Sequence, residues 1–398
     1  MVRSIFLFVC IIGINISVRA NLSAEAINIT VQAEAAILMN ASTGAILYEK
    51  NSKKPLYPAS ITKIATAAYA LEIAADKLLI SVTVNKEALG SVSSEAKKRS
   101  KYSLPAYWLE PGGSNIGLKS GEEILFRDLL YAMLVASAND AANVIADSVG
   151  GSIPNFIEQL NAFLKRTGCH QTTFYNPHGL YHPNHVTTAY DMAILTSHAM
   201  RNPLFRKIVS TTRYVRPKTN KQQASVIVQT NRLLKPGKCY YPKAIGVKTG
   251  YIALAQNTLV AAAVQGNRML IVVLLKCAER QEMFLEATKL FEAAFNQPKV
   301  KRVLVKAGET NYLFAPEGSS KAIKTTVAGE ISMEFYPAEE PELNASLKWK
   351  NVTYPLSAGH CVGEITITTG DGMLLHVVPL LAAEDLTSTW GHWLKNIF

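Results

Sequence analysis

The sequence predicts an α/β domain with a helical insertion, then a small all-β domain, then a C-terminal amphipathic helix. Short apolar runs near residues 35–49 precede a long helical stretch, and two apolar runs near residues 258–275 follow it. Strands on both sides of one helical stretch predict a single sheet built from both ends of the domain. After residue 297, short alternating runs replace the helical periodicity, which predicts the all-β domain.

The composition is that of a globular, basic protein. The chain has 398 residues, of which 48% are hydrophobic and 18% charged, and its formal net charge is +11. This length allows two domains with cores of their own, and the composition excludes a disordered chain. A basic surface suits an anionic partner such as a membrane surface, a wall polymer or nucleic acid, and charge alone does not choose among them.

Residues 1–20 are typical of a secretory signal peptide. Arg3 precedes an apolar segment over residues 5–18, and Val18-Arg19-Ala20 provides the small residues of a cleavage site. An uncleaved membrane anchor is the alternative, but polar residues interrupt the apolar segment. Under either interpretation, the rest of the protein is exported. Without Arg3 and Arg19, the 41 basic residues become 39 against 30 acidic ones, a net charge of +9.

Turn residues and periodicity predict the elements of the first domain. A β-hairpin surrounds Ala41-Ser42-Thr43-Gly44, and the strands over 258–264 and 269–275 flank the turn Gln265-Gly266-Asn267-Arg268. Helical periodicity predicts helices over 58–74, within 128–163, over 188–200 and over 279–295. Residues 90–120 and 213–250 are polar, so we expect connecting segments there. The basic cluster at 97–101 is interpreted as a solvated loop, with a patch that binds a polymer as the alternative.

The C-terminal part of the chain changes character twice. Gln297-Pro298 marks a boundary, and residues 297–383 hold alternating runs separated by turns, which predicts a β-sandwich-like domain. Residues 384–398 then place Leu386, Trp390 and Trp393 on one helical face. This helix is too short to span a bilayer, so we expect it to lie at a membrane surface. Docking onto the β-domain is the alternative.

Three short motifs contain the reactive side chains. Ser60 and Lys63 lie three residues apart at a helix start, so they share one helical face. A serine becomes a nucleophile when a base takes its proton, and a neutral lysine can do so. Ser137-Ala138-Asn139 interrupts the helical stretch, and Lys248-Thr249-Gly250 precedes the second pair of strands. Each motif alone is weak, but the three together define the penicillin-interacting serine enzymes.

The chain resembles the D-alanyl-D-alanine carboxypeptidases, which are low-molecular-mass penicillin-binding proteins. The likeness extends to further stretches over nearly the whole mature chain, such as Asn176-Pro-His-Gly-Leu180 and Thr230-Asn-Arg-Leu-Leu234. The resemblance implies a transpeptidase fold like that of penicillin-binding proteins and β-lactamases, with a mainly antiparallel sheet over residues 21–296. It also implies a periplasmic location on the cytoplasmic membrane, peptidoglycan stem peptides as substrates, β-lactams as inhibitors, and no metal, cofactor or nucleic acid.

The resemblance also assigns roles to the motif residues. Ser60 would attack the carbonyl between two terminal D-alanines, Lys63 would accept its proton, and Ser137 would relay a proton to the departing amine. The substrate would be bound by a second set, namely Asn139, Lys248, Thr249, Gly250 and Tyr251. The backbone N–H groups of Ser60 and Tyr251 would form the oxyanion hole.

Some positions depart from the family's usual pattern. Ile252 and Gln256 stand where a threonine and a glycine are common, and Asn40 stands where an aspartate is usual. These changes bear on substrate fit and rate more than on the nucleophile. His178 is interpreted as structural because Lys63 already supplies a base, and Glu158 as a carboxylate on a helix surface.

Three other functions remain as alternatives. D,D-endopeptidase action on cross-bridges cuts the same type of bond, and a wall-binding scaffold with a weak site would tolerate Ile252 and Gln256. A β-lactamase is disfavoured, because nothing resembles a dedicated deacylation base.

Overall fold

The computed structural model describes residues 27–317, 319 and 321–387. Contacts within the chain divide it into two compact units, one ending at Gln297 and the other beginning at Pro298. The predicted signal peptide and most of the predicted C-terminal helix lie outside the described residues. No helix within the described ranges has both the length and the apolar character needed to cross a membrane.

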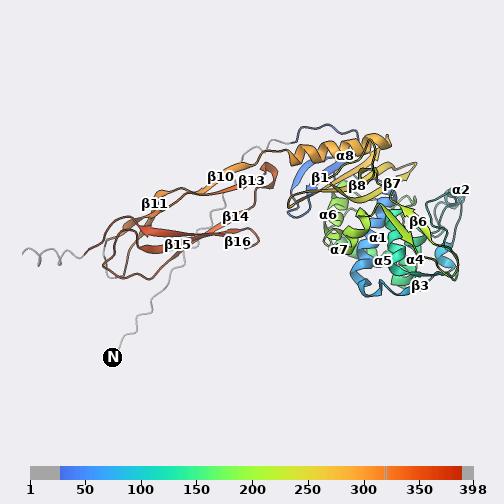
Figure 1. The fold of residues 1–398 in the computed structure, drawn as a ribbon, viewed down its shortest axis with the longest axis horizontal. Coiled ribbons are helices and arrows are strands. Elements are labelled where there is room, and N and C mark those ends of the chain that lie inside the picture. Colours follow the sequence, from blue (N-terminus) through green and yellow to red (C-terminus); the bar gives the residue numbers. More distant parts are fainter. Residues whose placement is uncertain (1–26, 318, 320, 388–398) are drawn as a thin grey trace, which may run out of the picture. The chain divides into compact units, whose positions relative to one another are not determined.

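The first unit is built on a five-stranded antiparallel sheet with the order β2-β1-β9-β8-β7 (Figure 1). Its strands are β1 (Ala35–Asn40), β2 (Ile46–Lys50), β7 (Ala244–Ile252), β8 (Gln256–Gln265) and β9 (Arg268–Cys277). β1 pairs with β9, from the opposite end of the unit, in the register Ile37 to Val273. This pairing confirms the predicted sheet, and it leaves β7 as a free edge.

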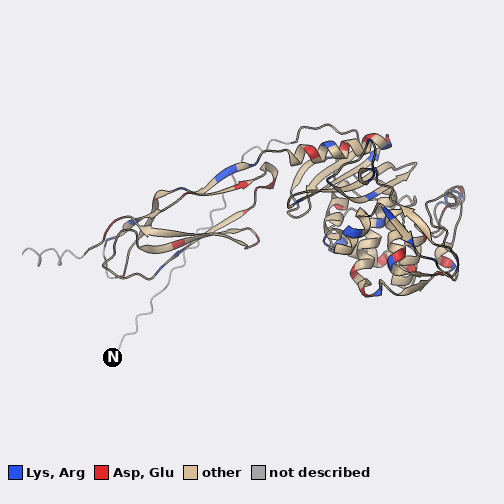
Figure 2. Ribbon diagram, in the orientation of Figure 1, with Lys and Arg blue, Asp and Glu red and all other residues tan. Residues whose placement is uncertain are grey.

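Helices cover both faces of this sheet. α8 (Arg280–Phe295) packs on β8 and β9, and Figure 1 shows the other helices of the unit on the opposite side. Acidic and basic positions are interspersed along α8 (Figure 2), whereas Phe284, Leu290 and Phe291 are buried against the strands. A helix with one charged and one apolar face fits this surface position.

The insertion is a helical bundle around α1 (Lys63–Ile73), which continues the 3-10 turn Ala59–Thr62. Every residue of α1 from Lys63 to Leu71 is buried. The helices that surround or follow it are α3 (Phe126–Val135), α4 (Asn139–Gly150), α5 (Ile153–Arg166), α6 (Ala189–Ala199) and α7 (Pro203–Ser210). The predicted breaks between α3, α4 and α5 are confirmed, and Gly151 ends α4 in a left-handed conformation with φ of 72°.

Two segments expected to be connections contain regular structure. Residues 90–120 include α2 (Ser94–Arg99), and residues 213–250 include the hairpin of β5 (Arg213–Arg216) and β6 (Ser225–Val228) and most of β7. Elsewhere β3 (Ser81–Thr83) pairs with β4 (Glu123–Leu125). The expectation of a wholly solvated basic cluster is wrong for Lys97. Its amine is buried and donates to the Trp108 carbonyl at 2.5 Å and to Glu110 at 3.2 Å.

The second unit is all-β, as predicted. A five-stranded sheet has the order β11-β12-β16-β15-β14, and β10 (Val300–Val305) pairs separately with β13 (Ile331–Phe335). The sheet strands are β11 (Gly308–Phe314), β12 (Ile323–Val327), β14 (Leu343–Trp349), β15 (Cys361–Thr369) and β16 (Leu374–Ala382). Leu386 bridges to Leu356 and is buried in the core of this unit. It therefore belongs to the β-domain rather than to a separate helix.

Candidate active site

Ser60 lies in the 3-10 turn that leads into α1, and two glycines approach this turn closely. A Cβ added to Gly250 would lie 2.7 Å from the Ser60 backbone nitrogen, and one added to Gly179 would overlap the Ala59 carbonyl. Ala59 has a positive φ of 51°, which an L-residue adopts only at some cost. The glycines therefore let β7 and the loop around residue 179 close on the turn that holds the serine.

The amine of Lys63 contacts three oxygens. Its Nζ lies 3.0 Å from Ser60 Oγ, 2.7 Å from Asn139 Oδ1 and 2.7 Å from the His178 carbonyl. The two carbonyl oxygens can only accept hydrogen bonds, so they take the two N–H groups of a neutral amine. Its lone pair is then left facing the Ser60 hydroxyl, which is the arrangement that a general base needs.

Burial and charge both favour the neutral form of Lys63. The side chain is fully buried, which lowers its pKa well below the usual value for lysine, and the positive charge of Lys248 lowers this pKa further. The carboxylate of Asp140 acts in the opposite direction. Burial raises the pKa of Asp140, but backbone N–H groups of the 116–118 loop hold its carboxylate.

The second motif meets the third at Ser137. Lys248 Nζ donates to Ser137 Oγ at 2.9 Å and to the Thr249 carbonyl at 2.8 Å. Ser137 has a positive φ of 64° between α3 and α4. This strained conformation belongs to the loop that brings its hydroxyl to the edge strand. Hydrogen bonds thus join Ser60, Lys63 and Asn139 in one group and Ser137 and Lys248 in another, and the charge of Lys248 acts on Lys63.

The rest of the third motif lies along the edge strand. Thr249 Oγ1 is 2.9 Å from Thr230 Oγ1, and the Tyr251 side chain is 64% exposed. Burial and, to a smaller extent, the positive charge of Arg280 together lower the pKa of Lys248 to about 7. Lys248 and Thr249 can therefore present a cation and a hydroxyl to a bound anion, and the positive charge of Arg280 adds to the field that acts on Lys248.

Sequence reasoning missed three contributors to the site. Arg280 lies at the first position of α8, and nothing in the local sequence signals that it approaches Lys248. Thr230 belongs to one of the stretches that carry the resemblance, but no role followed from it. The third is the backbone carbonyl of His178, which has no side-chain signature.

His178 takes a structural place, as predicted. Its Nδ1 accepts a hydrogen bond from the Leu180 N–H, so its Nε2 is the nitrogen that donates to the Tyr107 carbonyl, 3.0 Å away. Burial lowers the pKa of this imidazole well below its usual value. A neutral, doubly bonded ring fixes the loop whose carbonyl holds Lys63. Glu158 lies exposed on α5, away from these contacts.

Two further observations limit the chemistry of the described chain. Cys169, Cys239, Cys277 and Cys361 are all free thiols. Among residues 27–387, excepting 318 and 320, no group of three or more His, Cys, Asp or Glu side chains is placed to hold a metal ion.

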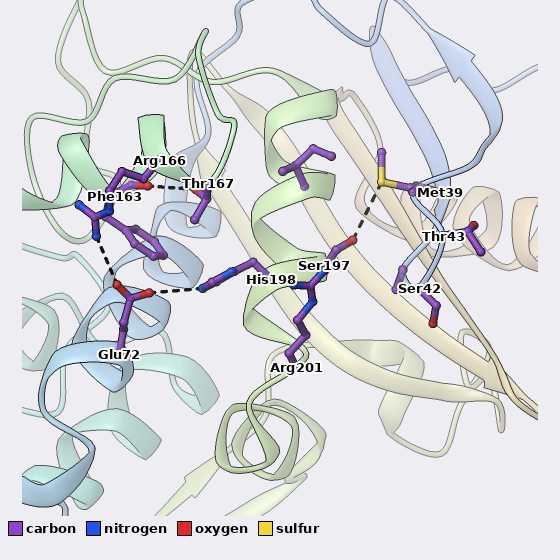
Figure 3. Close-up of a pocket in the computed structure, with 13 residues that line it drawn as sticks. Met39, Ser42, Thr43, Glu72, Phe163, Arg166, Thr167, Ser197, His198 and Arg201 are labelled. Carbon is purple, nitrogen blue, oxygen red and sulfur yellow. Dashed lines mark hydrogen bonds and ion pairs between the residues drawn. The ribbon is translucent and has the colours of Figure 1, made fainter. Parts of the chain in front are cut away.

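A cavity of about 530 Å³ lies elsewhere in the first unit, between α5, α6 and the β1–β2 turn (Figure 3). Glu72, at the far end of α1 from Ser60, contacts Arg166 at 3.3 Å and His198 at 3.5 Å there. Both partners lie in the last turns of their helices, where the helix dipole favours positive charge. No motif residue lines this cavity, and we interpret its charged side chains as stabilising the helix ends.

Comparisons with known proteins agree with this geometry. A sequence profile described as D-alanyl-D-alanine carboxypeptidase matches residues 20–279. The chain is similar to D-alanyl-D-alanine carboxypeptidase DacF of Bacillus subtilis, with 31% identity over 376 residues, covering 92% of this chain and 90% of the relative. It is also similar to DacC of Escherichia coli, with 30% identity over 392 residues, covering 90% and 85%.

Solved structures give the same result. Penicillin binding protein 5 from Haemophilus influenzae matches with a TM-score of 0.60 and 26% identity, covering 90% of this chain and 99% of that one. The DD-transpeptidase of Streptomyces K15 matches with a TM-score of 0.58 and 29% identity, covering 67% and 98%.

Proposed function

The chain belongs to the D-alanyl-D-alanine carboxypeptidase family of serine peptidases, and we propose that Ser60 is the nucleophile with which it releases the terminal D-alanine of peptidoglycan stem pentapeptides. The observation that carries this proposal is the contact of Lys63 Nζ with Ser60 Oγ and two carbonyl oxygens. It supplies a base whose lone pair is aimed at the hydroxyl.

Acylation begins when Ser60 Oγ attacks the carbonyl carbon of the penultimate D-alanine. Lys63 takes the hydroxyl proton as the new C–O bond forms. The developing oxyanion is bound by the backbone N–H groups of Ser60 and Tyr251, which the tight approach of Gly250 to Ser60 brings into one neighbourhood. Loss of one such donor typically lowers the rate by about 10²–10³.

The terminal carboxylate is bound at the other end of the site. Lys248, Thr249 and Arg280 provide the charges and the hydroxyl for it, and a carboxylate removed from water needs such partners. The amide of Asn139 contacts Lys63 through its oxygen, which leaves its N–H groups for the substrate. Gly250 keeps the strand free of a side chain there.

Collapse of the tetrahedral intermediate breaks the C–N bond and releases D-alanine. Ser137 Oγ accepts a hydrogen bond from Lys248, so its own O–H is free to donate a proton to the departing amine. The proton that Lys63 took from Ser60 then restores the Ser137 hydroxyl, so Ser137 acts as a relay and Lys63 is neutral again for deacylation. Water then attacks the acyl ester on Ser60, the C–Oγ bond breaks, and Ser60 recovers its proton. β-Lactams acylate the same oxygen through their strained amide.

The test of this function is release of free D-alanine from a pentapeptide that ends in D-Ala-D-Ala. The wild-type chain releases D-alanine, and a folded Ser60→Ala variant does not. Ser42→Ala, in the exposed β1–β2 turn, is the matched control and keeps full activity. Equal D-alanine release by the Ser60→Ala variant would show that Ser60 is not the nucleophile.

We also propose a location for the enzyme. Residues 1–20 direct export, and residues 388–398 hold the protein on the outer surface of the cytoplasmic membrane. Because Leu386 is part of the β-domain core, the informative truncation removes residues 388–398 alone. The truncated protein is expected to leave the membrane fraction while D-alanine release persists. Unchanged membrane association of the signal-cleaved truncation would contradict this location.

A further inference from the structure

A basic cavity lies in the first unit, where the turn Arg232–Leu234 packs against the edge strand β7. Its volume is about 320 Å³, and it is lined by the segment 232–239 and by Gln281 at the start of α8. Three of the lining side chains are cationic, namely Arg232, Lys235 and Lys238, and no carboxylate lines it. A hollow with three positive charges and no negative one attracts anions.

In the part of the chain that the structure describes, the three cationic side chains of the cavity make no contacts that would stabilise the fold through their charges. No ion pair or side-chain hydrogen bond joins Arg232, Lys235 or Lys238 to another residue within the described ranges, whereas Lys63 and Lys248 are both held by contacts of the site. Glu279 and Glu282 neighbour Gln281 in the sequence, but neither lines the cavity. Like charges this close in the chain repel one another, and a bound anion relieves that repulsion.

Two residues that line the cavity lie close in the chain to residues that act on the edge strand. Arg232 follows Thr230 by two residues, and Thr230 Oγ1 lies 2.9 Å from Thr249 Oγ1. Gln281 follows Arg280, whose charge acts on Lys248. The backbone between 233 and 241 is closed by a hydrogen bond from the Tyr241 N–H to the Leu233 carbonyl. The turn Arg232–Leu234, which contributes to the lining, also packs against β7, the edge strand that holds Lys248 and Thr249.

We propose that this basic cavity binds a second carboxylate, carried by the residue that leaves when the peptide bond is cut. The inference rests on the proposed function and names a substrate class for the same site. A lone D-alanine has no group that reaches past its own carboxylate, whereas an acidic leaving residue does. The acceptor strand of a cross-linked stem peptide is such a leaving group. The bond cut is unchanged, because Ser60 still forms the ester and the departing amine still takes the proton.

The test compares two peptides that share one acyl group and end in D-Ala-D-Ala or in D-Ala-D-Glu. A triple variant, Arg232→Gln with Lys235→Gln and Lys238→Gln, removes the cations of the cavity. Its kcat/KM for D-glutamate release is expected to fall about tenfold, the cumulative effect of three partly exposed charge contacts. Its kcat/KM for D-alanine release stays within about twofold of wild type, because a single carboxylate does not reach the cavity.

The matched control removes three exposed lysines elsewhere in the unit, through Lys77→Gln, Lys165→Gln and Lys207→Gln. It lowers the net charge equally and leaves both activities unchanged. Equal losses for both peptides in the cavity variant, or no loss for either, would overturn the proposal.

A second measurement does not depend on how the variant folds. In wild type, raising the salt from 50 to 500 mM is expected to lower kcat/KM for the D-glutamate peptide more than for the D-alanine peptide, since salt screens exposed charges. Equal salt effects contradict the proposal. If the wild-type protein releases no D-alanine, the proposed carboxypeptidase function itself is wrong. This result is distinct from a failure of the cavity proposal.

Discussion

The two units of the chain differ most in what they bury. The first unit buries charged side chains, among them Lys63, Lys248, Asp140 and Arg216. In the described residues from Pro298 onward, the one buried polar side chain is Thr325, which is satisfied by Thr310 and the Tyr312 carbonyl. Buried charge disfavours folding unless it is paired, hydrogen-bonded or neutralised. Arg216 is bound by backbone carbonyls, whereas Lys63 and Lys248 lie together at the proposed site, where perturbed pKa values are typical.

The second unit therefore has the core of a packing domain. Phe314, Ile323, Val362 and Leu380 are buried together, and along β12 buried residues alternate with exposed or half-buried ones. Nothing in its described core resembles the charged cluster around Ser60. Substitutions in the two units should therefore separate chemistry in the first from packing in the second.

Removing the amine of Lys63 is expected to have the largest effect. In Lys63→Met no base faces Ser60, so the rate of acylation by a fluorescent β-lactam falls about 10²–10⁴-fold. Lys50→Met is the control, because the Lys50 amine bonds only to the Val31 carbonyl among the described contacts, and its acylation rate stays unchanged. Normal acylation of Lys63→Met would show that another group takes the proton.

A core substitution in the second unit separates stability from chemistry. Leu380 is fully buried, so Leu380→Ala is expected to lower the free energy of unfolding of that unit by about 2–5 kcal/mol. D-Alanine release below the unfolding transition remains that of wild type. Leu374→Ala, at a 58% exposed position, is the control with little effect on either property. A large loss of kcat in folded Leu380→Ala would break the proposed division.

The pH dependence of kcat/KM is expected to report the protonation states of two buried lysines of the first unit, Lys63 and Lys248. Lys63 acts as a base only when neutral, so kcat/KM falls as the pH decreases through its lowered pKa. Lys248 attracts the substrate carboxylate only when charged, so kcat/KM also falls as the pH rises above about 7.

Arg280→Leu tests the cause of this alkaline limb. Arg280 lowers the pKa of Lys248, so its removal raises that pKa and moves the limb to higher pH, while the maximum falls because one carboxylate contact is lost. Arg166→Leu, at the distant cavity beside Glu72, leaves the profile unchanged. A limb that stays in place or moves to lower pH contradicts this assignment.

The smallest expected effect concerns Gln256, which the sequence marked as unusual. It has a positive φ of 52° at the first residue of β8, directly after the turn from β7, which explains why glycine suits this position. Gln256→Gly is expected to raise the free energy of unfolding by about 1 kcal/mol by relieving backbone strain. Thermal unfolding measures the change, and a decrease in stability would show that the glutamine side chain has a packing role.

The sequence predicted the reactive groups better than it predicted their supports. The reactive residues could be predicted because each has a distinctive side chain within a short motif. They are Ser60, Lys63, Ser137, Asn139 and Lys248. The His178 carbonyl and the approach of Arg280 depend on how distant segments pack, which no local pattern encodes. Lys97 was misjudged for the same reason, because Trp108 and Glu110 bury it only after the loop folds.

The same limit applies to the strands. Long apolar runs identified β8 and β9, whereas the short β5 and β6 have exposed valines and a buried Arg216. Arg216 is buried because carbonyls of the hairpin turn bind its guanidinium, a tertiary effect. In the second unit, β14 alternates apolar with polar residues. The sequence did not predict it as a separate strand, because the residues around it are also polar.

Acylation at Ser60 by an amine-activated attack is the claim on which the whole account depends. The most direct measurement is mass spectrometry of peptides from the wild-type protein after incubation with a β-lactam. We predict one covalent adduct, on the peptide that contains Ser60, with the modification at its hydroxyl. An adduct on any other side chain, with Ser60 unmodified, would contradict it.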